Sequence, residues 1–250
     1  MSSAPRTGSR PSRRTLLTVL ATLAVATLVL FIGFFITEDQ APQGQEGSAV
    51  SGVRESVGPS KVDLDTSRRI DGDATALGAV DAPVVLVEYA DYRCPFCGLF
   101  SRDTLPPLVD KYVDEGQVRI EWRDLPVFGE ESFQAAVAGR AAGEQGKFWE
   151  FNKAVFADAP ERGHIALPPE ELVRIAENVG VPDIKRFTAD LNSEELQQAV
   201  TADAEEAAAL GATGTPAFLI NDVPLTGAQP LEVFEEIIDA ALAEAEAEAQ

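Results

Sequence analysis

The sequence predicts an α/β fold that carries an inserted helical segment and is preceded by one transmembrane helix. Three observations predict it. A strand, a helix and a second strand follow one another between Val84 and Leu125, which is the order of a βαβ unit. A stretch of helical periodicity over residues 132–210 then precedes a hairpin and a closing helix. Finally, Leu16–Ile36 is an uncharged apolar run near the N-terminus.

The composition restricts the class of protein. The chain has 250 residues, of which 45% are hydrophobic, so a core can form and the chain as a whole is not disordered. All 41 acidic residues follow Thr37, whereas the whole chain has only 20 Lys and Arg. Phosphate binding needs clustered Lys and Arg. So acidic a body argues against nucleic acid as a partner and against binding along an anionic lipid surface.

The N-terminal apolar run is predicted to be a membrane anchor. Leu16–Ile36 has 21 residues without a charge, and as a helix it would be about 31 Å long, which matches a hydrocarbon core of roughly 30 Å. Four arginines precede it, so residues 1–15 are expected in the cytoplasm and the rest of the chain outside. The alternative is a cleaved signal peptide, whose apolar region is shorter, about 7–15 residues, and ends in a small-residue site.

The segment after the anchor predicts a linker. Residues 38–60 are rich in Gln, Gly, Ser, Pro and Glu and have no apolar periodicity. We expect a flexible linker over residues 37–66, which would let the folded part stand off the membrane. The folded part is then expected to consist of an α/β domain, residues 67–131 and 211–250, and a helical insertion, residues 132–210.

The α/β domain opens with a strand. Val84–Tyr89 is a short, valine-rich and nearly continuous apolar run, typical of a strand buried on both faces. Cys94-Pro95-Phe96-Cys97 follows and begins a helix that is expected to reach about residue 115, with a kink or interruption at Pro106-Pro107. Val118–Leu125 alternates between apolar and polar residues and predicts a second strand.

The insertion is predicted to be helical throughout. The expected helices share an apolar periodicity, and they cover residues 133–144, 148–156 and 169–179, a stretch that opens at Pro182, and a stretch from Ser193 to near Gly211. A hairpin about Asn221-Asp222 is expected next. An amphipathic helix that begins at Gln229-Pro230 would close the domain.

The chain has two cysteines, three residues apart. A disulfide scaffold would need more cysteines, spread more widely. A structural zinc site usually has four ligands, whereas His164 is the only histidine and is expected to be a solvated loop residue, so no metal is expected. The pair is therefore interpreted as a redox dithiol, with a structural disulfide or half of a metal site as the alternatives.

The start of a helix is a suitable place for a reactive thiol. Thiol–disulfide exchange needs an exposed thiolate and a second thiol that can resolve the mixed disulfide. A helix N-terminus presents unpaired N–H groups and a partial positive charge, which favour the thiolate. We therefore expect Cys94 to be the nucleophile, with a lowered pKa, and Cys97, one turn further, to be the more buried resolving thiol. Pro95 suits the first turn, Phe96 adds apolar surface near the sulfur, and both are expected to contact substrate.

Three segments carry a resemblance to a known family. Val-Glu-Tyr-Ala-Asp-Tyr-Arg-Cys-Pro-Phe-Cys, residues 87–97, resembles the active-site segment of DsbA-like thiol–disulfide oxidoreductases. Gly-Thr-Pro-Ala-Phe-Leu-Ile-Asn, residues 214–221, resembles the family's cis-proline segment, and Phe-Trp-Glu-Phe, residues 148–151, resembles part of its inserted helical domain. The resemblance covers about residues 69–245 and implies a thioredoxin-like fold with an inserted α-helical domain. The transmembrane helix lies outside it.

The resemblance also implies roles for individual residues. Cys94 resembles the family's attacking cysteine and Cys97 its resolving cysteine. Pro216 resembles the cis-proline that packs against the pair, and the backbone of Thr215 would pair with an extended substrate as an added strand. Glu88 stands where the family has a buried acid and would relay the proton of Cys97; the alternative for Glu88 is a charge that faces water. No cofactor is implied.

The expected protein is an enzyme, a membrane-anchored and extracytoplasmic protein dithiol–disulfide oxidoreductase. Because export places the pair in an oxidising compartment, we expect it to form disulfides in reduced exported proteins and to be recharged by a membrane redox partner. The direction depends on the reduction potential, and Phe96 and Thr215 leave open an isomerase or a reductase. A non-catalytic thioredoxin-like binding module with a structural disulfide is a further alternative.

Overall fold

The computed structural model describes residues 65–250. The expected anchor at residues 16–36 and nearly all of the expected linker lie outside the described residues, so both stay predictions. Within the described part, no helix is long and apolar enough to cross a membrane.

A five-stranded sheet forms the centre of the described part, in the order β1-β3-β2-β4-β5. The strands are β1 (Ala76–Leu77), β2 (Val84–Ala90), β3 (Val118–Asp124), β4 (Ala217–Ile220) and β5 (Val223–Thr226). β2 and β3 run parallel, and β4 runs antiparallel to both β2 and β5. This confirms the predicted βαβ unit and hairpin. The sequence did not predict β1, because a strand of two residues has no periodicity to detect.

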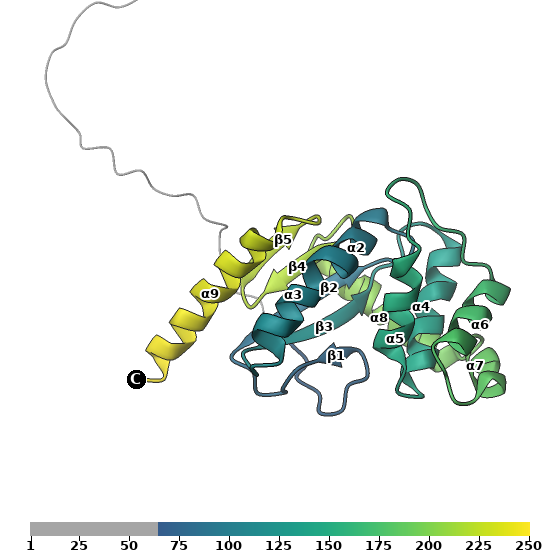
Figure 1. The fold of residues 1–250 in the computed structure, drawn as a ribbon, viewed down its shortest axis with the longest axis horizontal. Helices are drawn as coiled ribbons and strands as arrows, with labels where there is room; N and C mark the ends of the chain where they lie inside the picture. The colour runs from purple at the N-terminus through teal and green to yellow at the C-terminus, as the bar shows by residue number, and fades with distance from the viewer. Residues whose placement is uncertain (1–64) are drawn as a thin grey trace, which may run out of the picture. The chain divides into compact units, whose positions relative to one another are not determined.

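β2 is buried along its whole length, which confirms the prediction of a strand covered on both faces. Its side chains alternate between two clusters. Leu86 packs with Phe100 and Phe234 on one face, and Val87 packs with Ala207 on the other. The first face is covered by α9 (Leu231–Glu248) and the helical run after Cys94, and the second by α8 (Glu194–Ala209) (Figure 1).

The helical run after β2 is interrupted near its prolines, as predicted. It consists of α2 (Pro95–Leu99), the π-helical η1 (Phe100–Thr104), α3 (Leu105–Leu108) and the π-helical η2 (Val109–Val113). Pro106 and Pro107 have no backbone N–H, so they cannot complete the i→i−4 ladder of the preceding turn. The ladder widens there to a π-helical turn.

The insertion is helical, as predicted. Its helices before α8 are α4 (Glu130–Gly143), α5 (Phe148–Ala157), α6 (Pro169–Asn178) and α7 (Ile184–Asp190), and they are grouped beside the sheet (Figure 1). α7 begins two residues after the predicted Pro182 because the Asp183 side chain caps it and accepts a hydrogen bond from the Arg186 N–H at 2.9 Å. Ser193 caps α8 in the same way.

Tyr92 joins the insertion to the end of β2. Its ring stacks on Phe156 of α5 at a centroid distance of 5.5 Å and lies tilted against Trp122 of β3 at 5.1 Å. A Cβ atom at Gly139 of α4 would lie 2.3 Å from the Tyr92 hydroxyl oxygen. Only glycine therefore lets α4 approach this closely, and the insertion packs directly on the segment that leads to Cys94.

Candidate redox site

Cys94 and Cys97 lie at the start of α2, where the sequence predicts them. Cys94 occupies the N-cap position with extended backbone angles, and Pro95 fills the first turn. The Cys94 N–H donates to the Asp91 carbonyl at 3.0 Å, and the Cys94 carbonyl accepts from the Gly98 N–H at 3.1 Å. The turn after β2 therefore fixes Cys94 at the mouth of the helix.

Both thiols are buried, and here one expectation is wrong. Cys97 is fully buried as expected, but Cys94, which was expected to be exposed, has only 1% of its surface exposed. The Thr215 carbonyl covers it, and the Cys94 thiol donates to that oxygen at 3.2 Å. A substrate sulfur must pass this cover before it reaches Cys94.

The two thiols have opposite pKa shifts. The pKa of Cys94 is lowered to about 6, first by the hydrogen bond from the Cys97 thiol and then by the Thr215 side chain and by the backbone N–H groups of Cys97 and Phe96, against the effect of burial. The pKa of Cys97 is raised well above its usual value, chiefly by burial. The lower pKa of Cys94 and the higher pKa of Cys97 agree with the expected roles of nucleophile and resolving thiol. The largest cause of the lowered pKa of Cys94, however, is the Cys97 thiol rather than the helix end. At neutral pH the pair can therefore hold one thiolate and one thiol.

Glu88 lies on β2, six residues before Cys94, and does not face water. Only 1% of its surface is exposed, and its direct neighbours across the sheet are Trp122 and Phe218. Its Oε1 atom has no hydrogen-bond partner among the described residues. Burial, together with the charge of Cys94, raises the pKa of Glu88 to about 8. The carboxyl group therefore keeps its proton at neutral pH, and the alternative of a solvated charge is wrong.

The Thr215–Pro216 peptide bond is cis, as the resemblance implies. It lies directly before β4, and the Pro216 carbonyl accepts a hydrogen bond from the Gly227 N–H at 2.8 Å. The structure brings Thr215 against Cys94, although the two residues are 121 positions apart in the chain.

Asp91 organises the turn below Cys94, and sequence reasoning missed it. The side chain is buried. One carboxylate oxygen accepts from the Arg93 N–H at 2.7 Å, and the other accepts from the N–H groups of Val127 and Phe128 at 2.7 and 3.2 Å. Asp91 thus ties the end of β2 to the segment after β3. Its sequence signal was an aspartate between a buried strand and a helix start, where such a side chain commonly bonds to nearby backbone.

Arg93 and His164 fasten the insertion to the same turn. The Arg93 guanidinium donates to the carbonyls of Ile165 and Phe128, both at 2.9 Å. His164 Nδ1 lies 3.1 Å from the Arg93 carbonyl oxygen. The centroid of the His164 ring lies 4.0 Å from the centroid of the Phe128 ring. His164 is exposed, as expected of a loop histidine, but it also contacts the residue before Cys94. This contact could not be read from the sequence, because it joins positions 71 residues apart.

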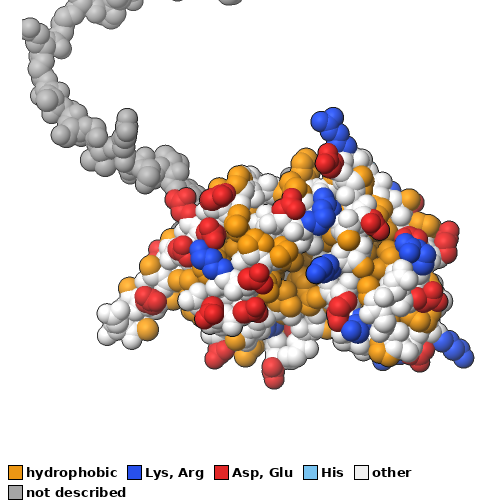
Figure 2. Space-filling model, viewed as in Figure 1, with side chains coloured by type: hydrophobic (Ala, Val, Ile, Leu, Met, Phe, Trp, Pro, Cys, Tyr) orange, Lys and Arg blue, Asp and Glu red, His pale blue; other side chains and the backbone are white. Residues whose placement is uncertain are grey.

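Exposed apolar side chains lie on and near α2. Phe96 has 57% of its surface exposed and Leu99 has 40%, and Val127, held by Asp91, has 41%. Pro95 is half-buried. On the face in Figure 2, acidic and basic side chains are interspersed with apolar ones. Among residues 65–250, no group of three or more His, Cys, Asp and Glu residues could hold a metal ion.

Comparisons with known proteins find one family model and several similar proteins. Residues 71–240 match the family model described as thioredoxin. A probable disulfide bond formation protein D from Bacillus cereus is 31% identical over 149 residues, which cover 58% of this chain and 69% of that protein. The chain is also 30% identical to Na(+)/H(+) antiporter NhaA 3 of Salinispora tropica, over 91% of this chain but only 33% of the antiporter.

Solved structures give the same result. The crystal structure of oxidised BdbD from Bacillus subtilis superimposes with a TM-score of 0.64 at 25% identity, covering 69% of this chain and 94% of that one. The structure of α-DsbA1 from Wolbachia pipientis gives a TM-score of 0.63 at 28% identity, covering 70% of this chain and 94% of that one.

Proposed function

The chain belongs to the DsbA-like, thioredoxin-fold family and is a thiol–disulfide oxidoreductase; from this premise we propose that it forms disulfide bonds in exported proteins through Cys94 and Cys97. One observation carries the proposal. The pKa of Cys94 is lowered to about 6, while that of Cys97, one turn away, is raised. A low pKa makes Cys94 a good leaving group and stabilises the reduced form of the pair, which makes the disulfide a stronger oxidant.

The reaction proceeds in two exchanges. A substrate thiolate attacks Sγ of Cys94 in the oxidised pair, a mixed disulfide forms, and the bond to Cys97 breaks. A second substrate thiolate then attacks the substrate sulfur of the mixed disulfide and releases Cys94 as a thiolate. The substrate loses two electrons and gains a disulfide, and the Cys94–Cys97 pair is reduced.

Glu88 supplies a proton in the first exchange. Cys97 must leave as a thiolate, which its burial disfavours. The carboxyl group of Glu88 is protonated at neutral pH because its pKa is about 8, so it can protonate the departing sulfur.

The substrate contacts four residues around Cys94, namely Thr215, Pro216, Pro95 and Phe96. The backbone of Thr215 pairs with an extended substrate segment, which the position of its carbonyl at 3.2 Å from Cys94 Sγ supports. The exposed ring of Phe96 and the half-buried Pro95 provide apolar contact beside the sulfur.

The protein works outside the cytoplasm, anchored by a transmembrane helix at residues 16–36, and a membrane redox partner reoxidises the pair. The anchor's length and the arginines before it support this placement. Residues 67–131 and 211–250 form the thioredoxin-like domain and residues 132–210 the helical insertion. This division is supported by the run of helices between β3 and β4.

An isomerase or a reductase is the second candidate function, because neither the motif nor the family membership fixes the direction of electron flow. A less oxidising pair would favour it. A non-catalytic module with a structural disulfide does not agree with membership of an enzyme family.

Trapping the mixed disulfide tests the proposed roles. In a Cys97→Ala variant the resolving thiol is absent, so the variant should accumulate mixed disulfides with reduced substrate proteins through Cys94. Non-reducing gel electrophoresis detects them, and the Cys94→Ala variant is the matched control that should trap none. Equal trapping by both variants, or by neither, would contradict the assignment.

A redox titration of the wild-type pair tests the direction. The proposal expects an oxidising potential together with oxidation of a reduced, unfolded protein. A potential as low as that of a stable structural disulfide, without turnover, would exclude the oxidase.

A further inference from the structure

Asp91 contacts both cysteines through its backbone. Its carbonyl accepts a hydrogen bond from the Cys94 N–H at 3.0 Å. Its N–H donates to the Cys97 sulfur and acts to lower the pKa of Cys97, although burial, the largest cause, raises that pKa well above its usual value. The position of the Asp91 backbone therefore bears on the placement of one cysteine and on the protonation of the other.

The carboxylate of Asp91 fixes this backbone. One oxygen accepts from the N–H of Arg93 at 2.7 Å, which closes a turn of the kind that aspartate favours. The other oxygen accepts from the N–H groups of Val127 and Phe128 at 2.7 and 3.2 Å. All three donors are backbone groups, and the side chain is buried. The carboxylate therefore holds two main-chain segments together, away from water.

The segment that contains Phe128 is itself fastened to the rest of the domain. The Phe128 carbonyl accepts from the Arg93 guanidinium at 2.9 Å, and the centroid of its ring lies 4.0 Å from that of the His164 ring. The Leu125 N–H donates to the Ala90 carbonyl at 2.9 Å, directly beyond the paired strands β2 and β3. The carboxylate therefore binds a segment that the sheet and the insertion both hold in place.

The turn determines which donors Cys94 meets at the start of α2. The pKa of Cys94 is lowered first by the Cys97 thiol and then, together with the Thr215 side chain, by the backbone N–H groups of Cys97 and Phe96. Hydrogen bonds weaken steeply when their distance or angle departs from the favoured geometry. If the turn relaxes, the Cys94 sulfur shifts relative to these donors, and its thiolate loses part of its stabilisation.

We propose that Asp91 is a positioning residue for thiol–disulfide exchange: its carboxylate fixes the turn that aligns Cys94 with the donors at the start of α2. The carboxylate acts through the main chain and takes no part in the exchange itself. The inference rests on the proposed function, because it takes Cys94 and Cys97 as the pair that exchanges disulfides with a substrate.

The direction of a pKa change separates this role from that of a nearby charge. A carboxylate close to a thiol disfavours the thiolate, so the loss of its charge alone lowers the pKa of the thiol. The loss of the turn instead takes donors away from the thiolate and raises that pKa. A residue that only stabilises the fold leaves the pKa unchanged. The three roles therefore predict three different results for Cys94.

Two substitutions of Asp91, titrated by thiolate absorbance in the reduced protein, test the proposal. Asn keeps the shape of the side chain but has only one acceptor oxygen, so it keeps part of the hydrogen bonds, whereas Ala keeps none. We expect the Cys94 midpoint to rise from about 6 by about one unit in Asp91→Ala and by less in Asp91→Asn. At pH 8 the Asp91→Ala pair should then be about tenfold less oxidising against glutathione, which equals about 30 mV. If Asp91→Ala does not fold, the rise in Asp91→Asn decides.

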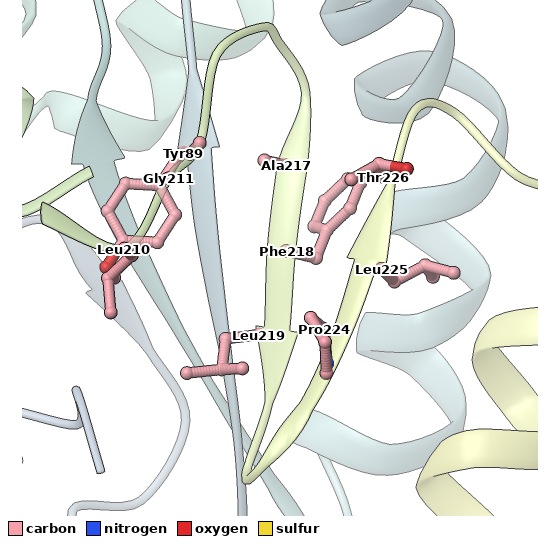
Figure 3. Close-up of a pocket in the computed structure, with 10 residues that line it drawn as sticks. Tyr89, Leu210, Gly211, Ala217, Phe218, Leu219, Pro224, Leu225 and Thr226 are labelled. Carbon is pink, nitrogen blue, oxygen red and sulfur yellow. The ribbon is translucent and has the colours of Figure 1, made fainter. Parts of the chain in front are cut away.

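A buried aspartate on the other face of the sheet is the matched control. Figure 3 shows Tyr89 and Leu219 on the same side of β4, and α8 packs on this side, where Glu206 accepts from the Tyr89 hydroxyl at 2.7 Å. Asp203 of the same helix is buried and also accepts from a backbone N–H, at 3.0 Å. Asp203→Ala should therefore lower the free energy of unfolding but leave the Cys94 midpoint and the glutathione equilibrium at the wild-type values.

The outcomes separate the inference from the proposed function. A midpoint that stays unchanged or falls in the Asp91 variants overturns the inference, whereas the oxidase function stands. An equal rise in Asp203→Ala also overturns it, because the rise would then follow from lost stability alone. If the wild type oxidises neither a reduced, unfolded protein nor dithiothreitol, the proposed function fails and the inference with it.

Discussion

Glu88 and Glu121 lie on neighbouring strands and are both buried, yet their carboxyl groups behave in opposite ways. Glu88 has an oxygen without a hydrogen-bond partner among the described residues, and its pKa is raised to about 8. Burial also acts to raise the pKa of Glu121, but hydrogen bonds from Arg68, Arg119, Arg123 and Arg69 together lower it to about 2. The distances of these hydrogen bonds are 2.7–2.9 Å.

The surroundings of the two residues explain the difference. Glu121 belongs to a network on the face below α8 in which Arg68 pairs with Asp203 at 2.7 Å and Arg140 pairs with Asp124 at 2.5 Å. Glu88 lies on the other face, between two aromatic residues. Burial alone therefore decides nothing about charge; the donors do. Glu121 is therefore ionised and paired with arginines, whereas Glu88 keeps its proton at neutral pH.

The largest effect on stability should come from removing the charge of Glu121 from its ion pairs with Arg119 and Arg123. Glu121→Gln would leave the buried guanidinium group of Arg119 without its countercharge and that of Arg123 with Glu206 alone, and it should reduce the free energy of unfolding by about 3–5 kcal/mol. Urea unfolding at pH 7 measures it. Glu144→Gln is the matched control: it removes the pair with Arg186, which is about half exposed on both sides, and should cost less than about 1 kcal/mol. Equal costs would show that burial of the network adds nothing.

The same substitution at Glu88 should have the opposite sign and should depend on pH. The pKa of Glu88 in the folded state is about 8, against an ordinary value of 4.5, so its contribution to stability is complete below about pH 4.5 and is lost as the pH rises to about 8. Glu88→Gln does not titrate. Between pH 5 and pH 8 it should therefore gain about 1–3 kcal/mol of stability relative to the wild type, both kept reduced. Urea unfolding at both pH values measures the gain, and a difference that does not change with pH would show that Glu88 is already ionised.

The smallest effect concerns the pKa of Cys94, which the neighbouring Cys97 thiol lowers although burial acts to raise it. The Cys97 thiol is the leading cause of the lowered pKa of Cys94. In the reduced wild type, thiolate absorbance should titrate near pH 6, and Cys97→Ala should raise that midpoint by about one unit, or about 1.4 kcal/mol. Cys94→Ser is the control and should abolish the transition. An unchanged midpoint in Cys97→Ala would assign the shift to the helix end instead.

The sequence was informative where one short segment determines the outcome. The valine-rich run of β2, the serine before α8 and the proline pair after α2 each act on their immediate neighbours, and each gave the predicted structure. The spacing of Cys94 and Cys97 similarly fixes them on one turn of helix. These features need no knowledge of the rest of the chain.

Contacts between distant segments could not be predicted. The alternation of β3 indicated a strand, but a polar face usually meets water. Here Arg119, Glu121 and Arg123 are buried, because distant segments supply partners: the Arg68 N–H donates to Glu121, and Glu206, 138 positions after Arg68, pairs with Arg123. The cover over Cys94 depends in the same way on Thr215, 121 positions further along the chain.

The attachment of the first described residues has a mechanical consequence. The N–H groups of Arg68 and Arg69 bind Glu121, and Arg123 donates to the Thr66 carbonyl at 3.2 Å. Any tension that enters the domain from its N-terminal side is therefore loaded first onto β3 and, through Asp203, onto α8. These contacts with β3 would bear a pulling force on a tethered domain before the force reached the turn that carries Cys94.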